Sequence, residues 1–416
     1  MSKLGNLLSF LEFSFLTSFD SIYYSYGNPY QGILIIIKMK NIKYYASIFL
    51  ILISCTNSKD IKKSTKTIIS IDLIKDTLRL SSLGVVDSII ILETKSESLI
   101  SRIDKVIFTD LRIYILDRDG GKGIYVFSKN GRFVRNYCKI GTGPEEYLTI
   151  EDFTYDRKNG IFYILNNRKE VSVIDTTGKF IKSFRNNFPA MKIEVNSKYK
   201  RLYFIGDNED FNLIVTDLNG KRTAGYFPNS EFKTHIRVLN NPFQNMDSII
   251  IYRRYLDDNI YQLSGDEMSV RYNIDFGQNS LDHSNLIKLL EIQGKKPFED
   301  AIAKYKTHIK YYLEDKKFIY FLFFTDKMPC LCIYDKGSGL SGSYLYTYLK
   351  EDLFNSSYFP ILEYVNEKNN LVFFTEPEVL KKYLNSQKSY LITTKKYKDK
   401  ILNLNAMSNP ILISIK

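Results

Sequence analysis

The chain has 416 residues, a net charge of +12, and hydrophobic and charged fractions of 44% and 25%. These fractions are ordinary for a folded protein and exclude a chain that is disordered throughout. The lysine clusters at 59–66 and in the loop-like stretch 395–400 contain few aromatic residues for stacking on bases, so we expect no nucleic-acid partner. We interpret both clusters as solvated surface, with an anionic membrane as one candidate neighbour. Tyr and Phe number 32 and 28, which favours β-strands.

Residues 1–38 show no helical or strand periodicity and precede a short basic segment that begins at Met39. We expect Met39 to be the functional start, which makes residues 1–38 a mis-called upstream extension. A genuine N-terminal extension is the alternative, and it would leave the export signal internal.

Residues 39–55 have the layout of a signal peptide. A basic stretch from Met39 to Lys43 is followed by ten apolar residues from Tyr44 to Ile53, which are too few for a spanning helix. The closing Leu52-Ile53-Ser54-Cys55 resembles a lipobox, in which the thiol accepts a diacylglycerol. This resemblance implies lipid attachment at Cys55, palmitate-type acylation and export to the outer membrane, with residues 56–68 as a tether.

One pattern recurs along the rest of the chain: a strand-like run, an Asp or Ser, two turn residues, often a Gly, and a second strand-like run. The Asp or Ser position advances by 47, 42, 47 and then 71 residues. Asn-Gly and Thr-Gly supply the positive φ angles of tight hairpins, so each copy predicts one hairpin. The five copies are centred on Ser128, Asp175, Asp217, Ser264 and Asp335.

Another pair of strand-like runs precedes each hairpin, for example 105–108 with 113–117 and 152–156 with 161–165. Four strands in a unit of 42–47 residues are typical of a β-propeller blade. The longest step contains helical spacing at 286–292 and 298–305, which predicts an insertion that packs over one face of the disc, and a further short helix is predicted at 377–384. Residues 69–416 therefore predict an all-β fold, a six-bladed β-propeller with a short helical insertion.

Four runs of the sequence resemble those of a known family. They are Ile89 to Thr94, Leu99 to Asp104, Gly141-Thr-Gly-Pro-Glu-Glu-Tyr147 and Asn409 to Lys416. The chain resembles the six-bladed β-propeller lipoproteins of Bacteroides-type gut bacteria, whose function is largely unassigned. The family usually has a third Gly where this chain has Glu145. The resemblance implies the fold and export, and it brings no catalytic residues.

A ring of blades needs a closure, because open sheet edges invite aggregation. Ile411 to Ile415 is a strand-like run at the C-terminus, and Ile89 to Leu92 is a similar run before the first blade. We expect the two runs to share one blade, or to lie in blades that meet across the seam.

Three motifs are candidates for chemical sites. Gly141-x-Gly143 lacks the third Gly and the following helix of a dinucleotide site, so a turn between blades is favoured. His235, His283 and His308 are spaced too irregularly for a metal site or a triad. Cys330 and Cys332 lie on one face of a strand, which favours buried thiols over a disulfide or a metal site.

Tyr252, Arg253, Arg254 and Tyr255 form the one basic-aromatic cluster on a predicted strand. Alternation sends the two Arg side chains to opposite faces, so one of them is a candidate to face the channel and bind an acidic ligand. Decoration of an edge strand is the favoured interpretation, and the three residues Tyr252, Arg253 and Arg254 remain the weak binding candidates.

Two functions stay open. The first is a binding module, without a cofactor, that holds a glycan, peptide or protein at one mouth of the propeller. The alternative is a propeller-type hydrolase or lyase with a divalent cation such as calcium in the central channel, for which Glu151, Asp152 and Asn240 are the residue types required. Fold alone does not decide between them.

Overall fold

The computed structural model describes residues 19–24, 35–39, 59–62, 67–137, 141, 149–206, 210–228, 241–277, 296, 300, 307–325, 328–354, 359–362, 364–385 and 392–416. The chain divides into two compact units, 1–57 and 58–416, and each is described by itself. None of the helices in the described ranges is long and apolar enough to cross a membrane.

The first unit contains one antiparallel strand pair, β1 (Phe19–Tyr24) and β2 (Ile35–Met39). The pair forms although the sequence of residues 1–38 shows no strand period. The two segments are rich in aromatic and β-branched residues, which favour strands even without a clear alternation. Residues 40–58, including Cys55, lie outside the described residues.

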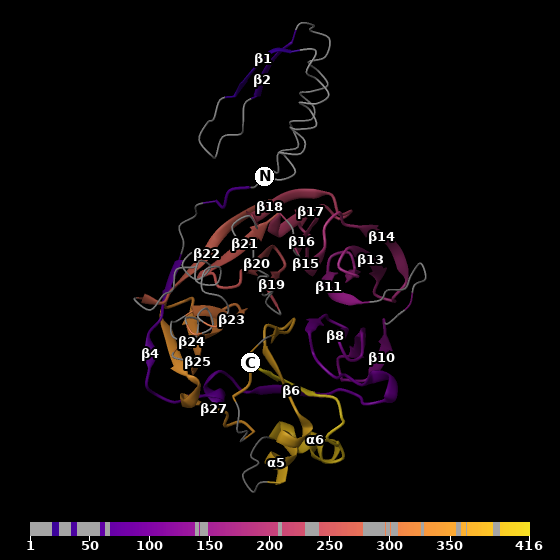
Figure 1. The fold of residues 1–416 in the computed structure, drawn as a ribbon. Coiled ribbons are helices and arrows are strands. Elements are labelled where there is room, and N and C mark those ends of the chain that lie inside the picture. Colours follow the sequence, from indigo (N-terminus) through magenta and orange to yellow (C-terminus); the bar gives the residue numbers. More distant parts are fainter. Residues whose placement is uncertain are drawn as a thin grey trace. The chain divides into compact units, whose positions relative to one another are not determined.

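The second unit is a β-propeller of six blades, as the sequence predicts (Figure 1). The first three blades are each built from four consecutive antiparallel strands, with the first strand innermost and the fourth at the rim. Blade 1 contains β7 (Lys105–Phe108), β8 (Arg112–Asp117), β9 (Gly123–Ser128) and β10 (Phe133–Asn136); blade 2 contains β11 (Ile150–Asp156), β12 (Ile161–Asn166), β13 (Glu170–Asp175) and β14 (Phe180–Arg185); blade 3 contains β15 (Ala190–Asn196), β16 (Arg201–Gly206), β17 (Phe211–Thr216) and β18 (Arg222–Pro228).

The remaining blades each include a strand from the N-terminal part of the unit. Blade 4 contains β19 (Phe243–Met246), β20 (Ile249–Arg253), β21 (Asn259–Ser264), β22 (Glu267–Asp275) and β3 (Thr67–Ser70); blade 5 contains β23 (Thr307–Glu314), β24 (Phe318–Thr325), β25 (Met328–Asp335), β26 (Ser341–Leu345) and β4 (Leu73–Ile74); blade 6 contains β28 (Tyr364–Val365), β29 (Leu371–Thr375), β30 (Ile411–Ile415) and β6 (Val86–Ile91). A short parallel pair joins β27 (Leu349–Lys350) to β5 (Leu78–Arg79).

All five predicted hairpins join the third and fourth strands of blades 1–5. Gly131, Gly178 and Gly220 each have a φ of 84°, the left-handed conformation that the Asn-Gly and Thr-Gly turns require. The Asp175 carboxylate accepts hydrogen bonds from the backbone N–H groups of Thr177 at 2.8 Å and Lys179 at 3.0 Å. The repeated Asp therefore caps the turn through its side chain.

The predicted closure is confirmed, because β30 and β6 lie side by side in blade 6. Ile411 pairs with Ile91 and Ile413 with Ile89, so the two ends of the domain share one sheet. All five residues of β30 are buried. The sheet thus has no free edge at the seam.

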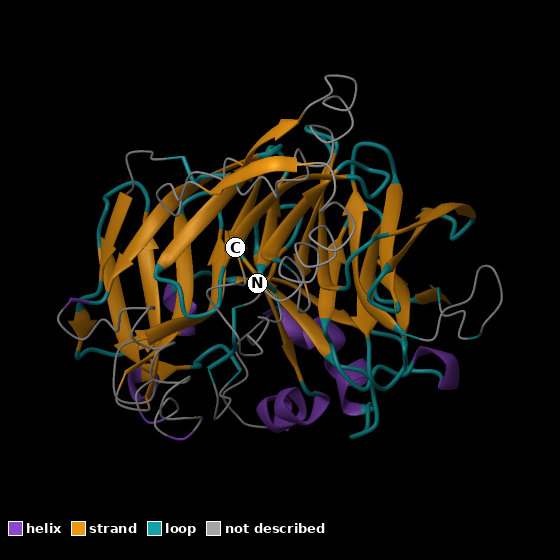
Figure 2. Ribbon diagram, turned by 45° about the horizontal axis from the view of Figure 1, so that its top comes forward, coloured by secondary structure: helices purple, strands orange, loops and turns teal. Residues whose placement is uncertain are grey.

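Alternating strand directions divide the turns between two faces of the disc. The connections between blades, and those between second and third strands, lie on one face, which we call the connection face. The tight turns between first and second strands and the five hairpins lie on the other, the hairpin face. Helix α5 (Pro377–Asn385) confirms the helix predicted at 377–384. It lies in the connection between β29 and β30, on the connection face. Figure 2 shows the helices along one margin of the molecule.

Helix α6 (Ile392–Leu402) corrects the loop-like interpretation of the second lysine cluster. Lysine is a good helix former, and Lys398 and Lys400 are exposed, as expected for solvated surface. Cys330 and Cys332 are both buried thiols that form no disulfide, which confirms that prediction. Apart from Lys296 and Asp300, the predicted helical insertion before Thr307 lies outside the described residues.

Strands β3, β4 and β5 run along the rim of blades 4 and 5 and lead into blade 6, and we call residues 59–79 the belt. Its backbone already meets the domain at Lys59, whose N–H donates to the Gly225 carbonyl at 3.2 Å. The tether predicted over 56–68 therefore contains residues that belong to the domain, and the domain boundary of residue 69 is corrected. Sequence periodicity missed the belt because its strands are only two to four residues long.

Candidate functional site

The first strands of the blades begin at the connection face and carry charged residues into the centre of the disc. Lys105 begins β7, Asp152 lies near the start of β11, and Lys192 and Glu194 lie in β15. We call these four residues the channel cluster. All four side chains are buried or nearly so, because the first strands of neighbouring blades pack closely around the axis.

Lys105 connects the two carboxylates of the channel cluster. Its Nζ lies 3.3 Å from Asp152 Oδ2 and 3.4 Å from Glu194 Oε2. Burial alone would lower the pKa of this ammonium group, but the two carboxylates outweigh burial and raise the pKa above its ordinary value. Lys105 is therefore held charged, as a link between blades 1, 2 and 3.

Glu194 also joins neighbouring blades through neutral donors. Its Oε1 accepts hydrogen bonds from Thr154 Oγ1 at 2.6 Å and from Asn245 Nδ2 at 3.0 Å. These partners come from the first strands of blades 2 and 4. Most of the channel cluster is thus a structural network that fixes the inner strands relative to one another.

Two polar groups of the channel cluster have unmet bonding capacity among the described residues. The Lys192 side chain makes no hydrogen bond or ion pair with them, and the residue is only 7% exposed. Burial lowers its pKa, since the charged form is disfavoured there. Asp152 Oδ1 is also buried without a hydrogen-bond partner in this part of the chain.

The residues named for a cation site do not converge. Glu151 Oε1 accepts from Thr149 Oγ1 at 3.1 Å and lies 3.8 Å from Arg168 Nε, whereas Asp152 points to Lys105. Glu151 lies at a register shift of β11 between Ile150 and Asp152, and the two carboxylates have different partners. Asn240 lies outside the described residues, and within the described ones no three His, Cys, Asp or Glu residues are grouped to hold a metal ion.

The structure corrects the interpretation of Tyr252, Arg253 and Arg254 as edge-strand decoration. Strand β20 is the second strand of blade 4 and pairs with both β19 and β21. All three residues are buried. The two charges favoured an exposed position on an edge strand, but both Arg side chains contact other groups inside the protein.

Both Arg side chains serve packing between elements. The Arg253 guanidinium donates to the backbone carbonyls of Asn241 and, at 3.3 Å, Lys310, which links blade 4 to the first strand of blade 5. The Arg254 guanidinium lies 4.4 Å from the centre of the Phe227 ring. Tyr252 donates its hydroxyl hydrogen to Asn212 Oδ1 at 2.6 Å.

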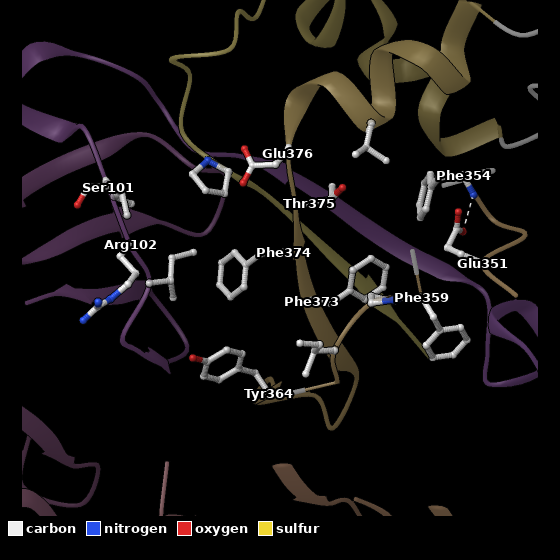
Figure 3. Close-up of a pocket in the computed structure, with 16 residues that line it drawn as sticks. Ser101, Arg102, Glu351, Phe354, Phe359, Tyr364, Phe373, Phe374, Thr375 and Glu376 are labelled. Carbon is white, nitrogen blue, oxygen red and sulfur yellow. Dashed lines mark hydrogen bonds between the residues drawn. The ribbon is translucent and has the colours of Figure 1, made fainter. Parts of the chain in front are cut away.

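A cavity of about 470 Å³ opens between blade 6 and the segment that leads into blade 1, and we call it the seam cavity (Figure 3). This volume lies within the range of sites for small ligands. Its walls come from residues 100–103, the segment before β28, the end of β29, and the first turn of α5. All of these segments lie on the connection face.

Five aromatic rings line the seam cavity, together with Ile, Val and Pro side chains. Successive residues Phe373 and Phe374 point to opposite sides of β29, so the cavity borders both faces of this strand (Figure 3). Phe374 packs edge-on against Tyr364, with ring centres 5.7 Å apart, and Phe373 packs against Phe354 at 6.5 Å. Phe359 completes the aromatic lining.

Three charged residues line the same cavity. Arg102 is engaged by Asp104 and Asp119, and Glu351 Oε1 accepts two backbone N–H groups at 2.7 Å. Glu376 is exposed, and its carboxylate forms no ion pair with any described residue. Glu376 is therefore the charged group of the lining that is available to a ligand (Figure 3).

Sequence reasoning missed both the seam cavity and the buried Lys192. Lysines inside apolar strand-like runs, at 105 and 192, were a usable signal for buried charge. The seam cavity had no such signal, since Phe373 and Phe374 are ordinary strand residues. Its walls come from opposite ends of the domain, which only the closure brings together.

Other candidates lie outside the described residues. These are Cys55, His235, His283, and the Gly-x-Gly-Pro run after Gly141. His308 lies in β23, and its surroundings are not described.

Comparison with known proteins gives a family and a fold. No curated protein matches the chain. A protein of Bacteroides fragilis that is described as exported matches with a TM-score of 0.68 and 18% identity, over 84% of this chain and 99% of that one. BamB from Moraxella catarrhalis matches at 12% identity over 70% and 75% of the two chains, but its TM-score of 0.38 carries no argument. A family model described as a domain of unknown function, DUF4934, matches residues 67–416, and the chain therefore belongs to the DUF4934 family.

Proposed function

We propose that this DUF4934 protein is an exported lipoprotein that acts as a ligand-binding module, with its ligand held in the seam cavity. The observation that carries the proposal is the cavity of about 470 Å³ with aromatic walls on the connection face. Concave sites of this size with apolar walls and few polar groups are typical ligand sites. The channel cluster supports the inner strands and is not part of the proposed ligand site.

The lining specifies the chemistry of the ligand. Four Phe rings and Tyr364 favour a ring or a branched apolar group, which would gain from contact with ring faces and edges. The Glu376 carboxylate favours a positively charged or hydrogen-bond-donating group at the mouth. An amine that carries an aromatic ring satisfies both conditions, either free or as a side chain of a peptide.

The lipid anchor rests on the sequence. The basic segment, the apolar run and Leu52-Ile53-Ser54-Cys55 occur in the order that lipoprotein export requires, and the similar Bacteroides fragilis protein is described as exported. We assign the acyl chains to Cys55 and the outer membrane as the destination. No observation favours the alternative hydrolase or lyase, whose cation residues do not converge where they are described.

The anchor is tested by metabolic labelling with an alkyne analogue of palmitate in a bacterium that processes lipoproteins. We expect Cys55→Ala to abolish labelling and to release the protein from the membrane fraction, whereas Cys138→Ala keeps both. Labelling that persists in Cys55→Ala would contradict the anchor.

The ligand site is tested with tryptamine as a cationic ring probe and 3-methylindole as its neutral counterpart. The protein contains no Trp, so indole fluorescence reports the probe alone. We expect tryptamine to bind more tightly than 3-methylindole, Glu376→Gln to remove this preference, and Phe374→Ala to weaken both probes about tenfold. Ile181→Ala, at a 49% exposed residue of blade 2, is the matched control. Binding that is equal in wild type and Phe374→Ala, or absent in both, would refute the site.

A further inference from the structure

The belt fixes where the chain enters the domain. Its first contact is the Lys59 N–H bond to the Gly225 carbonyl of β18, at the rim of blade 3. Three residues later, the Lys62 N–H donates to the Met268 carbonyl at 2.9 Å, and Lys62 Nζ lies 2.6 Å from Glu267 Oε1. The belt then continues along β22 and β26. From Lys59 onward the chain is therefore attached to the rim of the disc where blades 3 and 4 meet, close to the hairpin of blade 4.

The chain leaves little length between this attachment and the proposed lipid. Four peptide units separate Cys55 from Lys59. A fully extended chain spans about 3.6 Å per residue, so Lys59 stays within about 15 Å of the acylated cysteine in any conformation. This limit is short compared with the tether of residues 56–68 that the sequence suggested.

We propose that the protein stands edge-on at the membrane, with the rim of blade 3 against the lipid headgroups and the seam cavity on the far side. The proposal rests on the lipid anchor at Cys55. In a ring of six blades, blade 3 is opposite blade 6, and Figure 1 shows β18 and the α5–α6 region at opposite sides of the disc. Lys59, whose Nζ donates to the Asp266 backbone carbonyl at 3.5 Å, places its ammonium group beside the bilayer, where anionic headgroups attract it.

Edge-on mounting has a functional consequence. The connection face and the hairpin face both stay open to solvent, and the seam cavity is directed away from the bilayer. A ligand therefore reaches the cavity from solution. A disc mounted on either face would instead cover one set of turns.

The test uses single tryptophans in the full-length lipidated protein, whose natural sequence contains none. Asp60→Trp reports the rim of blade 3, and Val85→Trp, at a 60% exposed residue beside β6, reports the opposite rim. Met407→Trp and Leu111→Trp, at residues 77% and 73% exposed, report the connection and hairpin faces. Each variant is bound to phosphatidylethanolamine and phosphatidylglycerol vesicles that carry a nitroxide quencher on a fraction of the headgroups.

We expect quenching at Asp60→Trp to be at least twice that at each of the other three positions. If quenching is strongest at Val85→Trp, the rim of blade 6 and not that of blade 3 faces the membrane. If quenching is strongest at Met407→Trp or Leu111→Trp, the disc lies on one of its faces and the edge-on mounting is wrong. Equal quenching at all four positions would also overturn the proposal. Mass spectrometry of the same samples separates the two claims: unacylated protein refutes the anchor together with the mounting, whereas acylated protein with the wrong pattern refutes the mounting alone.

Discussion

The hydroxyl oxygens of Ser88 and Ser414 lie 2.8 Å apart across blade 6, although 326 positions separate the two residues in the chain. The pair sits in the register that joins β6 to β30. The seam of the propeller is thus held by one antiparallel strand pair and by the buried side chains around it. The seam cavity adjoins this closure, so the integrity of the proposed site depends on it.

Removal of residues 409–416 is expected to cost far more than an ordinary tail deletion. It removes β30, whose five residues are all buried, and leaves β6 and β29 with unpaired backbone groups. Loss of three buried Ile side chains alone corresponds to more than about 5 kcal/mol. Thermal unfolding and light scattering measure the effect, with Lys416→Ala as the control. A truncated protein that stays monomeric with an unchanged Tm would rule out the closure.

Ile413→Ala tests the apolar packing at the seam without removing the strand. Ile413 is fully buried and pairs with Ile89, so truncation leaves a cavity and is expected to lower the free energy of unfolding by about 2–5 kcal/mol. Val85→Ala, at a 60% exposed residue next to the same strand pair, is expected to change it by less than about 0.5 kcal/mol. Denaturant titration compares the two, and similar losses would contradict the packing.

The ion pairs of Glu314 predict that the free energy of unfolding decreases at acidic pH. Its side chain is fully buried and lies 2.7 Å from Arg271 Nη2 and 3.0 Å from Lys336 Nζ. Burial would raise the pKa of this carboxyl, but Arg271 and Lys336 outweigh it and lower the pKa below its ordinary value of 4.5. The contribution of Glu314 is therefore complete above about pH 4.5 and is lost as the pH falls through the lowered pKa.

Glu314→Gln is accordingly expected to lower the free energy of unfolding at pH 7 by about 2–3 kcal/mol. The difference from wild type should shrink below about pH 4.5, because the wild-type carboxyl then loses its charge as well. Denaturant titrations at pH 7 and pH 3.5 provide the comparison. A difference that is equal at both values would refute the role of the charge.

Lys192→Met is expected to stabilise the protein. The substitution removes a buried ammonium group without an ion-pair partner among the described residues, and it keeps a similar volume, which corresponds to a gain of about 1–3 kcal/mol at pH 7. Burial lowers the pKa of Lys192 from its ordinary value of 10.5, so the folded wild type releases this proton first and the advantage of the variant should narrow as the pH rises. Lys198→Met, at an exposed lysine in the same blade, is the control. Loss of stability in Lys192→Met would contradict this account.

The repeated hairpins made the propeller predictable, because Asn-Gly and Thr-Gly turns are local and each copy contains its own signal. The closure was also predictable, since a buried apolar run such as Ile411–Ile415 at a chain end needs a partner strand. The belt could not be predicted, because strands as short as Leu73–Ile74 carry no period.

The seam cavity depends on contacts that no local pattern encodes. Arg102 and Phe374 line one cavity only after the two ends of the domain meet, and the charge of Arg102 gives no hint of a ring nearby. Conversely, the conspicuous pair Arg253 and Arg254 is occupied by backbone carbonyls and by Phe227. A cluster of charges in a sequence does not show whether its partners are ligands or other parts of the fold.

The most direct measurement for the proposed function is a crystal structure of the protein soaked with 5-bromotryptamine, in which the anomalous scattering of bromine locates the ring. We predict a bromine peak in the seam cavity, in contact with Phe374 and Tyr364, with the amine directed to Glu376. The height of the peak should fall in Phe374→Ala crystals when both are soaked at a probe concentration close to the wild-type Kd. A peak elsewhere on the molecule, or an empty seam cavity at saturating probe, would contradict the account.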